Sequence, residues 1–286
     1  MKMRVLVSVM TYPTLSGKHI ETVCTAGFRE DGTWIRIFPV PLRLLPTVDD
    51  NKLPYSKWQW IEVDLKQNPS HDDRPESYHI NDIDSLQAME RIDKRGKPNW
   101  GLRLDWTLKN KRLFTNMTEL LDMTRKNQIS LAVLKPLEIK RVLAEQIVID
   151  DEYRQRLLKI RQKYEADLAQ PSLFDEQLMK RDFIFAEKIP YRFRYVFTTD
   201  DGVERKIMIE DWEICQLYRN LRKKHNEHIA CQMVCDRYME LANKNDIYFF
   251  MGTSFQWQKR KSPDPYLIIG VFYPPKQENS LPSLFD

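Results

Sequence analysis

Alternating apolar and polar residues dominate the first half of the chain. This period of two is typical of β-strands that bury one face, and residues 30–32 (Glu-Asp-Gly) add a tight-turn signal for a hairpin. Two short helices are expected at 83–89 and 117–125. The pattern therefore predicts a β-rich, barrel-like domain over residues 1–149. Its strands are expected at residues 4–10, 21–40 (the hairpin), 58–65, 130–139 and 142–149.

The period changes to that of a helix at residues 150–168. Acidic residues open this run, basic residues follow, and Tyr153, Leu157 and Ile160 recur at helical spacing. Such a charge-laced pattern is typical of a solvated helix between domains. We therefore place a helical linker at residues 150–188.

The remaining pattern alternates between strand and helix in the order ββααββ. A hairpin is expected around residues 200–202 (Asp-Asp-Gly), and two helices at 211–221 and about 227–242. This order predicts an α+β domain over residues 189–275, followed by a tail at 276–286. The predicted fold class is α+β, with an N-terminal barrel-like domain and a C-terminal ββααββ domain joined by a charged helix.

Composition sets limits on the class of protein. The 286 residues are 42% hydrophobic, which supports buried cores, and no stretch approaches the about 18 apolar residues of a membrane span. The four cysteines are too few and too clustered for a disulfide framework, so we expect a reducing cytoplasm. The net charge of +4 permits a polyanionic partner without requiring one.

Two predicted strands pair an aliphatic face with a face that mixes tryptophan and charge. Ile35 and Ile37 share one face of their strand, and the opposite face holds tryptophan and arginine. Aromatic rings beside cations suit base stacking and phosphate contacts, so we predict DNA binding by this face. The alternative is that the rings pack under loops or against the other domain. The predicted nucleic-acid-binding residues are Trp34, Arg36, Trp58, Trp60 and Arg74.

The same region contains a candidate nuclease site. Asp64-Leu65-Lys66 fits the D-x-K element of metal-dependent nucleases, with Asp50 as a further carboxylate. Carboxylates would hold Mg²⁺ and the lysine would lie beside the attacking water. The candidate catalytic residues are Asp64, Lys66 and Glu62, and Mg²⁺ would be the cofactor. Solvated charges at a strand end explain the same residues.

The C-terminal half offers a weaker candidate. His228, Cys231 and Cys235 fall on one helix face, which raises the question of a metal site. Their spacing misses that of zinc knuckles, and apolar residues share the face, so we interpret the cysteines as core and assign no metal. Asp211 and Glu213 are interpreted as the N-cap and first turn of a helix.

The pentapeptide Pro-Ser-Leu-Phe-Asp occurs at residues 171–175 and again at 282–286. With the preceding glutamine, the first copy resembles the bacterial sliding-clamp-binding peptide, usually Gln-Leu-Ser/Asp-Leu-Phe; Pro171 replaces its usual leucine. The resemblance implies that a sliding clamp is a partner, with leucine and phenylalanine filling an apolar groove. The alternative is that each copy folds back onto its own protein or onto a second copy of it. The implied partner-binding residues are Gln170, Leu173, Phe174, Leu284 and Phe285.

These observations give a leading hypothesis and two alternatives. The first is a bacterial cytoplasmic protein that reads or processes DNA, in repair or in defence against mobile DNA and phage, recruited by a sliding clamp. The second is a Mg²⁺-dependent nuclease centred on Asp64 and Lys66. The third is a non-catalytic module whose aromatic faces bind protein.

Overall fold

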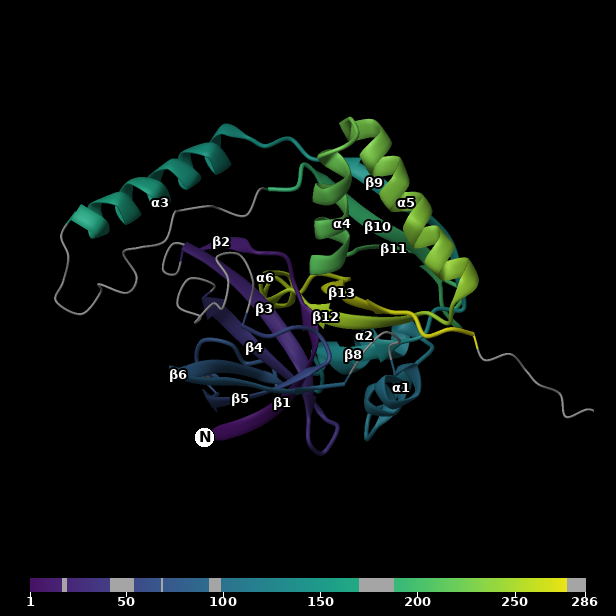
Figure 1. Cartoon of the computed structure of the whole chain (residues 1–286). Coiled ribbons are helices and arrows are strands. Elements are labelled where there is room, and N and C mark those ends of the chain that lie inside the picture. Colours follow the sequence, from purple (N-terminus) through teal and green to yellow (C-terminus); the bar gives the residue numbers. More distant parts are fainter. Residues whose placement is uncertain (17–19, 42–53, 68, 93–98, 170–187, 277–286) are drawn as a thin grey trace, which may run out of the picture.

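A computed structural model describes the chain at residues 1–16, 20–41, 54–67, 69–92, 99–169 and 188–276. Figure 1 shows a β-barrel, a four-stranded sheet beside it, and beyond that a three-stranded sheet with two helices. None of the helices in these ranges is long and apolar enough to cross a membrane.

The N-terminal strands close into a barrel, as the sequence predicts. The sheet order is β1-β5-β6-β4-β3-β2, and an additional pairing of β1 with β3 closes the ring. Aliphatic side chains of alternate residues fill the interior, among them Val5, Val7, Ile35, Ile37, Ile61 and Val63. The strands are β1 (Lys2–Met10), β2 (Thr14–Ser16), β3 (Ile20–Arg29), β4 (Trp34–Pro41), β5 (Gln59–Lys66) and β6 (Ser77–Arg91).

The closing contact between β1 and β3 requires glycine at position 27. A Cβ atom at Gly27 would lie 2.1 Å from the main-chain oxygen of Leu6. The β3–β4 hairpin also turns at a glycine, because Gly32 has a φ of +88°. Both glycines therefore serve the backbone geometry of the barrel.

Two sheets and five helices make up the described part of the C-terminal unit. The sheet orders are β13-β12-β8-β7 and β11-β10-β9. The predicted ββααββ order is present, and three strands that precede it in the sequence join the same sheets. The elements after the barrel are α1 (Trp100–Leu108), β7 (Leu113–Phe114), α2 (Met117–Arg125), β8 (Leu131–Leu134), β9 (Glu138–Gln146), α3 (Asp151–Ala169), β10 (Tyr191–Thr198), β11 (Arg205–Met208), α4 (Trp212–Arg222), α5 (Glu227–Lys244), β12 (Tyr248–Thr253), α6 (Phe255–Lys259) and β13 (Tyr266–Phe272).

The strand pairings move the domain boundary from the predicted residue 149 to about residue 110. β8 pairs with β12, and β9 pairs with β10. Residues 113–146 therefore belong to the C-terminal unit, although they precede the predicted linker. The helix α3 is present where the linker was predicted, and it lies at the periphery near β2, where Arg156 bonds the Leu15 carbonyl oxygen.

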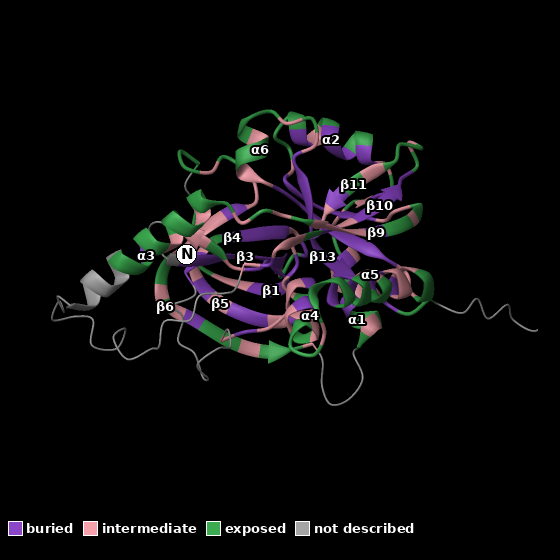
Figure 2. Ribbon diagram, turned by 90° about the horizontal axis from the view of Figure 1, so that it is seen from above, coloured by how far each residue is buried: buried purple, intermediate pink, exposed green. Residues whose placement is uncertain are grey.

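The four-stranded sheet is buried on both of its faces. Phe249 and Met251 of β12 point into the core shared with α4 and α5, whereas Phe250 points toward the barrel. In β13, Ile268 likewise packs in the core shared with α4 and α5, and Ile269 packs toward the barrel. Every residue of β12 and β13 is therefore buried, as the continuous purple of β13 shows in Figure 2.

Two helix predictions had opposite outcomes. Helix α2 forms as predicted, with Asn116 as its N-cap and Glu119 in its first turn. The predicted helix at 83–89 is wrong, because these residues lie in strand β6. β6 pairs with β5, and Leu86 faces the barrel core, so tertiary pairing overrides a weak local pattern.

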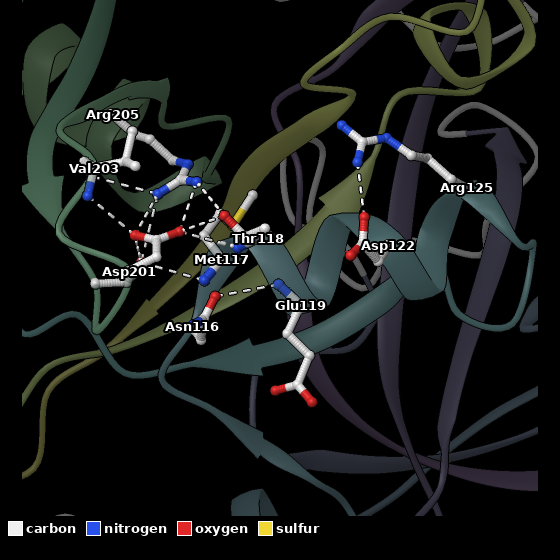
Figure 3. Close-up of polar contacts among 10 residues, drawn as sticks. Asn116, Met117, Thr118, Glu119, Asp122, Arg125, Asp201, Val203 and Arg205 are labelled. Carbon is white, nitrogen blue, oxygen red and sulfur yellow. Dashed lines mark hydrogen bonds and ion pairs between the residues drawn. The ribbon is translucent and has the colours of Figure 1, made fainter.

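The N-terminus of α2 is fixed by the β10–β11 turn (Figure 3). The Asp201 carboxylate accepts hydrogen bonds from the main-chain N–H and hydroxyl of Thr118, at 3.1 and 2.7 Å. It also forms an ion pair with Arg205 at 2.7 Å, and both side chains are about nine-tenths buried. The Arg205 guanidinium and the Thr118 and Thr199 hydroxyls hold the pKa of Asp201 well below its ordinary value. The turn therefore anchors one end of α2.

Candidate functional site

The predicted tryptophan face is not an open surface. Trp34, Trp58 and Trp60 are each only 7% exposed. They lie in the core between the barrel and the four-stranded sheet, where Trp34 lies 5.5 Å from Phe250 and Trp58 lies 5.3 Å from Phe272, measured between ring centroids. The prediction that these rings form an exposed base-stacking face is wrong, and the alternative of packing against the other unit describes them.

Arg36 and Arg74 are also buried, so they do not form the predicted phosphate-contacting surface. Arg36 is 1% exposed and donates to the Ser130 hydroxyl at 2.7 Å, and burial lowers its pKa to about 10. Arg74 forms a two-point ion pair with Asp72, at 2.8 and 2.6 Å, and donates to the Thr253 carbonyl oxygen. Both arginines link the barrel to the C-terminal unit.

The candidate nuclease residues lie on β5, toward its C-terminal end. The Asp64 carboxylate accepts hydrogen bonds from the Met1 amino group and from the Asn81 side chain. Glu62 pairs with Lys2 at 3.4 Å, and Lys66 is exposed at the end of the strand. In the described ranges, no group of three or more His, Cys, Asp and Glu residues could hold a metal ion. Asp50 lies outside the described residues.

The C-terminal cysteines and the start of α4 have the packing and capping roles that the sequence predicts. Cys231 packs in the core with Val234, while His228 is exposed, and burial raises the pKa of the Cys231 thiol to about 11. Asp211 caps α4 by accepting the Glu213 N–H at 3.2 Å. The cap residue also has a second role, in an ion pair across the two units.

A cavity of about 130 Å³ opens where the barrel meets the C-terminal unit. We call this contact the seam and the cavity the seam pocket. Its walls come from β1, the segment before β5, the end of β6 and α1 on one side, and from α4, β12 and β13 on the other. The lining combines aromatic rings with three cationic side chains.

Lys57, which lines the seam pocket, takes part in a buried ion pair. The Lys57 ammonium lies 2.6 Å from Asp211 and 3.2 Å from Glu213, and Asp211 is completely buried. Asp211 also accepts the Val271 N–H at 3.3 Å. Burial raises the pKa of Asp211 from 3.8 to about 6, despite the nearby ammonium. Burial lowers the pKa of Lys57, but the two carboxylates outweigh this effect and raise it above its ordinary value.

The backbone beside this ion pair is unusual. Trp58 has a φ of +64°, in the left-handed region that a bulky side chain rarely occupies. Its N–H donates to the Val7 carbonyl oxygen at 2.5 Å, and its own carbonyl accepts the Ile92 N–H at 2.7 Å. This conformation aims the Trp58 ring into the pocket wall, and strained residues of this kind cluster at functional sites.

Two arginines supply positive charge to the seam pocket. Arg103 of α1 lies over the Trp58 and Trp100 rings, at 5.0 and 5.7 Å, and donates to the Ile92 carbonyl oxygen. Arg91, at the end of β6, is exposed and forms no ion pair with a carboxylate in the described part of the chain. Arg91 is therefore available to an anion that enters the pocket.

Ser8 brings an unpaired hydroxyl to the same cavity. The β1–β3 register shifts between Val7 and Val9, so Ser8 sits on a β-bulge, a feature that re-aims side chains near functional sites. Ser8 is 2% exposed, and its hydroxyl has no hydrogen-bond partner among the described residues. A buried hydroxyl without a partner costs free energy unless a ligand or water satisfies it.

Sequence reasoning singled out two of these lining residues: Trp58, assigned to an open face, and Glu213, assigned to the first turn of a helix. The others were missed because they come from segments far apart in the chain. One signal was present: Lys57 adjoins the predicted tryptophans, and Asp211 was already identified as a helix cap. Nothing in the pattern predicted that these two positions would meet.

Two family models match the chain. The domain of unknown function DUF8758 matches residues 1–109, and the domain of unknown function DUF8757 matches residues 113–286, more than half of the chain. The chain belongs to the DUF8757 family. The DUF8757 segment begins at the same place as the boundary that the strand pairings give. No curated protein matches the chain.

The seam pocket joins the two matched segments. Ser8, Lys57, Arg91 and Arg103 come from the first segment, and Glu213 comes from the DUF8757 segment. The two copies of the clamp-like peptide fall in the DUF8757 segment as well, but residues 170–187 and 277–286 lie outside the described residues.

Proposed function

We propose that the protein is a nucleic-acid-associated protein that binds a nucleotide in the seam pocket. The observation that carries this proposal is the unpaired Ser8 hydroxyl, turned by a β-bulge toward a cavity lined with aromatic rings and arginines. A nucleotide offers each of these groups a partner: a ring, an anionic phosphate and several hydrogen-bonding atoms.

The size of the seam pocket indicates how much of the ligand is enclosed. A cavity of about 130 Å³ is close to the roughly 150 Å³ that holds one benzene ring. Pockets for complete small-molecule ligands are larger, at roughly 300–1,000 Å³. The pocket therefore accommodates one ring or one phosphate group, and the remainder of the ligand extends outside. A nucleotide, either free or in a strand, has this form.

The charges of the seam pocket favour an anion. Lys57 is already neutralised by Asp211 and Glu213, whereas Arg91 has no carboxylate partner in the described ranges. Arg103 lies over the Trp58 and Trp100 rings that line the site. An arginine that meets a phosphate forms charge-assisted hydrogen bonds, which are stronger than neutral ones.

Replacing Arg91 by alanine is expected to weaken nucleotide binding about tenfold, because it removes one charge-assisted contact of about 1.4 kcal/mol. Calorimetric titration measures the affinity of the wild type and the variant. The ligands are AMP, GMP, CMP and UMP, their deoxy forms, and short single strands of DNA and RNA. The comparison of mononucleotides with strands distinguishes a free ligand from a nucleotide within a polymer. The matched control is Arg141→Ala, which removes an exposed arginine of β9. Equal effects of the two variants, or no binding of any probe, would remove the proposal.

We further propose that the clamp-like peptides recruit the protein to a bacterial sliding clamp. Support comes from the sequence, in which the peptide occurs twice and the first copy follows α3. Two copies on one chain can engage two sites of a ring, which raises avidity when the spacing fits.

We expect Phe174→Ala and Phe285→Ala each to weaken clamp binding by about 2 kcal/mol and together to abolish it, because each removes an aromatic anchor. Titration of a purified bacterial sliding clamp with the wild-type chain and the three variants measures the effect. Leu158→Ala, which truncates an exposed leucine of α3, serves as control. Binding that survives in the double variant would contradict recruitment through these peptides.

A further inference from the structure

A basic surface forms where the end of α2 lies beside α6. The Gln258 side chain donates to the Asn127 side chain at 3.1 Å and joins the two segments. Figure 2 shows both helices at one end of the molecule, opposite α1 and α4, which border the seam pocket. We call this region the α2–α6 surface. Its exposed members are Arg125, Lys126, Trp257, Lys259, Arg260 and Lys261.

Most of the cations on this surface have no ion-pair partner among the described residues. Arg125 pairs with Asp122 at 2.8 Å, and both side chains are more than half exposed. The other four cations form no ion pair with a carboxylate in the described part of the chain. Cations at helix C-termini are favoured by the helix dipole. However, α6 has only five residues, so its dipole accounts poorly for three consecutive basic residues.

The backbone at this surface supports a specific role for the cations. Lys261 has a φ of +53°, a conformation that glycine or asparagine adopts at lower cost. Asn127, which follows α2, has a φ of +52°. Glycine or asparagine would adopt this left-handed conformation at a lower cost in free energy. The lysine at this position adds a third positive charge beside Lys259 and Arg260.

An exposed tryptophan lies among these cations. Trp257 is 37% exposed, although tryptophan is usually buried in a fold of this size. Phe255 of the same helix lies near two cations, with the Arg74 guanidinium at 5.3 Å and the Lys259 ammonium at 5.9 Å from its ring. An aromatic ring beside several free cations suits a strand whose bases stack and whose phosphates contact lysine and arginine.

A second basic run in the chain provides a contrast. Arg222, Lys223 and Lys224 follow one another at the end of α4. No exposed large aromatic side chain lies in this run, and Arg222 has Glu227 as a neighbour at 3.9 Å. The two runs carry the same charge. Variants of each run therefore distinguish a general effect of positive charge on binding from an effect specific to the α2–α6 surface.

We propose that the α2–α6 surface binds single-stranded nucleic acid, with bases stacked on Trp257 and phosphates held by Lys126, Lys259, Arg260 and Lys261. The site is distinct from the seam pocket and does not depend on it. The Asp201 cluster fixes the other end of α2 (Figure 3), so the helix presents its basic end from a rigid support.

The test uses the full chain and fluorescently labelled single strands of DNA and RNA of about 12 nucleotides, within the usual range of site sizes. Affinity is measured by anisotropy between about 50 and 200 mM salt. Three to four phosphate contacts predict a slope of log affinity against log salt of about −2 to −3. We expect Trp257→Ala to weaken binding about tenfold at each salt concentration, because it removes one stacking interaction.

The triple variant Lys259→Gln, Arg260→Gln, Lys261→Gln should bring the slope close to −1, whereas the matched variant Arg222→Gln, Lys223→Gln, Lys224→Gln should leave it unchanged. Thermal melting of each variant confirms folding, and Trp257→Ala provides the test if the triple variant unfolds. Three results would each overturn the proposal: no binding, binding unaffected by Trp257→Ala, or equal competition by polyglutamate. Trp257 does not line the seam pocket, so Trp257→Ala should leave mononucleotide binding at the pocket unchanged. Failure here is therefore distinguishable from failure of the pocket proposal.

Discussion

We expect the replacement of Gly27 by alanine to lower the free energy of unfolding by at least about 3 kcal/mol, the upper part of the range for overpacking. An alanine Cβ would lie 2.1 Å from the Leu6 carbonyl oxygen, far inside van der Waals contact. The obstructing atom belongs to the backbone of β1, so no rotation of a side chain relieves the clash. The strand pair that closes the barrel must separate, and the core of aliphatic residues inside it loses its packing.

Urea unfolding followed by circular dichroism measures this effect. Gly101→Ala is the matched control, because Gly101 lies in α1 and the nearest atom to an added Cβ is 3.9 Å away. This substitution should raise stability by up to about 1 kcal/mol, since alanine favours a helix over glycine. Similar stabilities for the two variants would contradict the close approach of β1 and β3.

The second large effect is expected for Lys57→Met, which should lower the free energy of unfolding by about 3–5 kcal/mol at pH 8. Methionine preserves most of the side-chain volume but leaves the Asp211 carboxylate without its cation. Asp211 is completely buried and also holds the N-terminus of α4 and the main chain of β13. The loss therefore affects the barrel, the helix and the four-stranded sheet together.

The penalty should depend on pH. Burial already raises the pKa of Asp211 from 3.8 to about 6, and loss of Lys57 removes an interaction that lowers it. An acid whose pKa is raised in the folded state binds more protons when folded. The variant therefore loses stability as pH rises from about 3.8 through its own folded-state pKa, which lies above that of the wild type. Lys57→Met should therefore be closer to the wild type near pH 4 than at pH 8.

The companion variant Lys57→Met, Asp211→Asn separates charge from packing. Asparagine retains an N-cap oxygen but carries no charge, so part of the stability at pH 8 should return and the added pH dependence should disappear. Denaturant unfolding from pH 4 to pH 8 measures both variants. A pH-independent loss in Lys57→Met would show that the ion pair is not the cause.

The fold was largely predictable because its patterns are local. The first strand and the β3–β4 hairpin follow from alternation and from the turn at Gly32. The position of residues 113–146 was not predictable in this way. Their strands β8 and β9 pair with partners more than a hundred and about fifty residues later, and short-range pattern carries no information about such pairing.

The misplacement of the tryptophan face has a particular physical cause. Alternation correctly separates Trp34 from Ile35, but it does not indicate whether the second face meets water or another sheet. The continuous apolar runs of β12 and β13 carried the missing information, because a strand without polar positions is buried on both faces. One face packs in the core with β10, α4 and α5, and the tryptophan side of the barrel covers the other.

The seam pocket was less accessible to prediction than the fold. Its residues meet only after the two units pack, and its clearest signals are properties of the folded backbone. They are the bulge at Ser8 and the positive φ of Trp58. Ser8 has no unusual residue type, and Trp58 was selected only as a ring on a strand face, so neither backbone feature is visible in the sequence.

The measurement that tests the central claim most directly compares Ser8→Ala with the wild type in two ways. If the pocket binds a nucleotide through this hydroxyl, calorimetric titration with the best-bound mononucleotide should show binding weakened about five- to tenfold, the value of one hydrogen bond. Urea unfolding without ligand should show equal or greater stability, because alanine removes a buried hydroxyl that has no partner among the described residues. Unchanged nucleotide affinity in a stable Ser8→Ala protein would contradict the account.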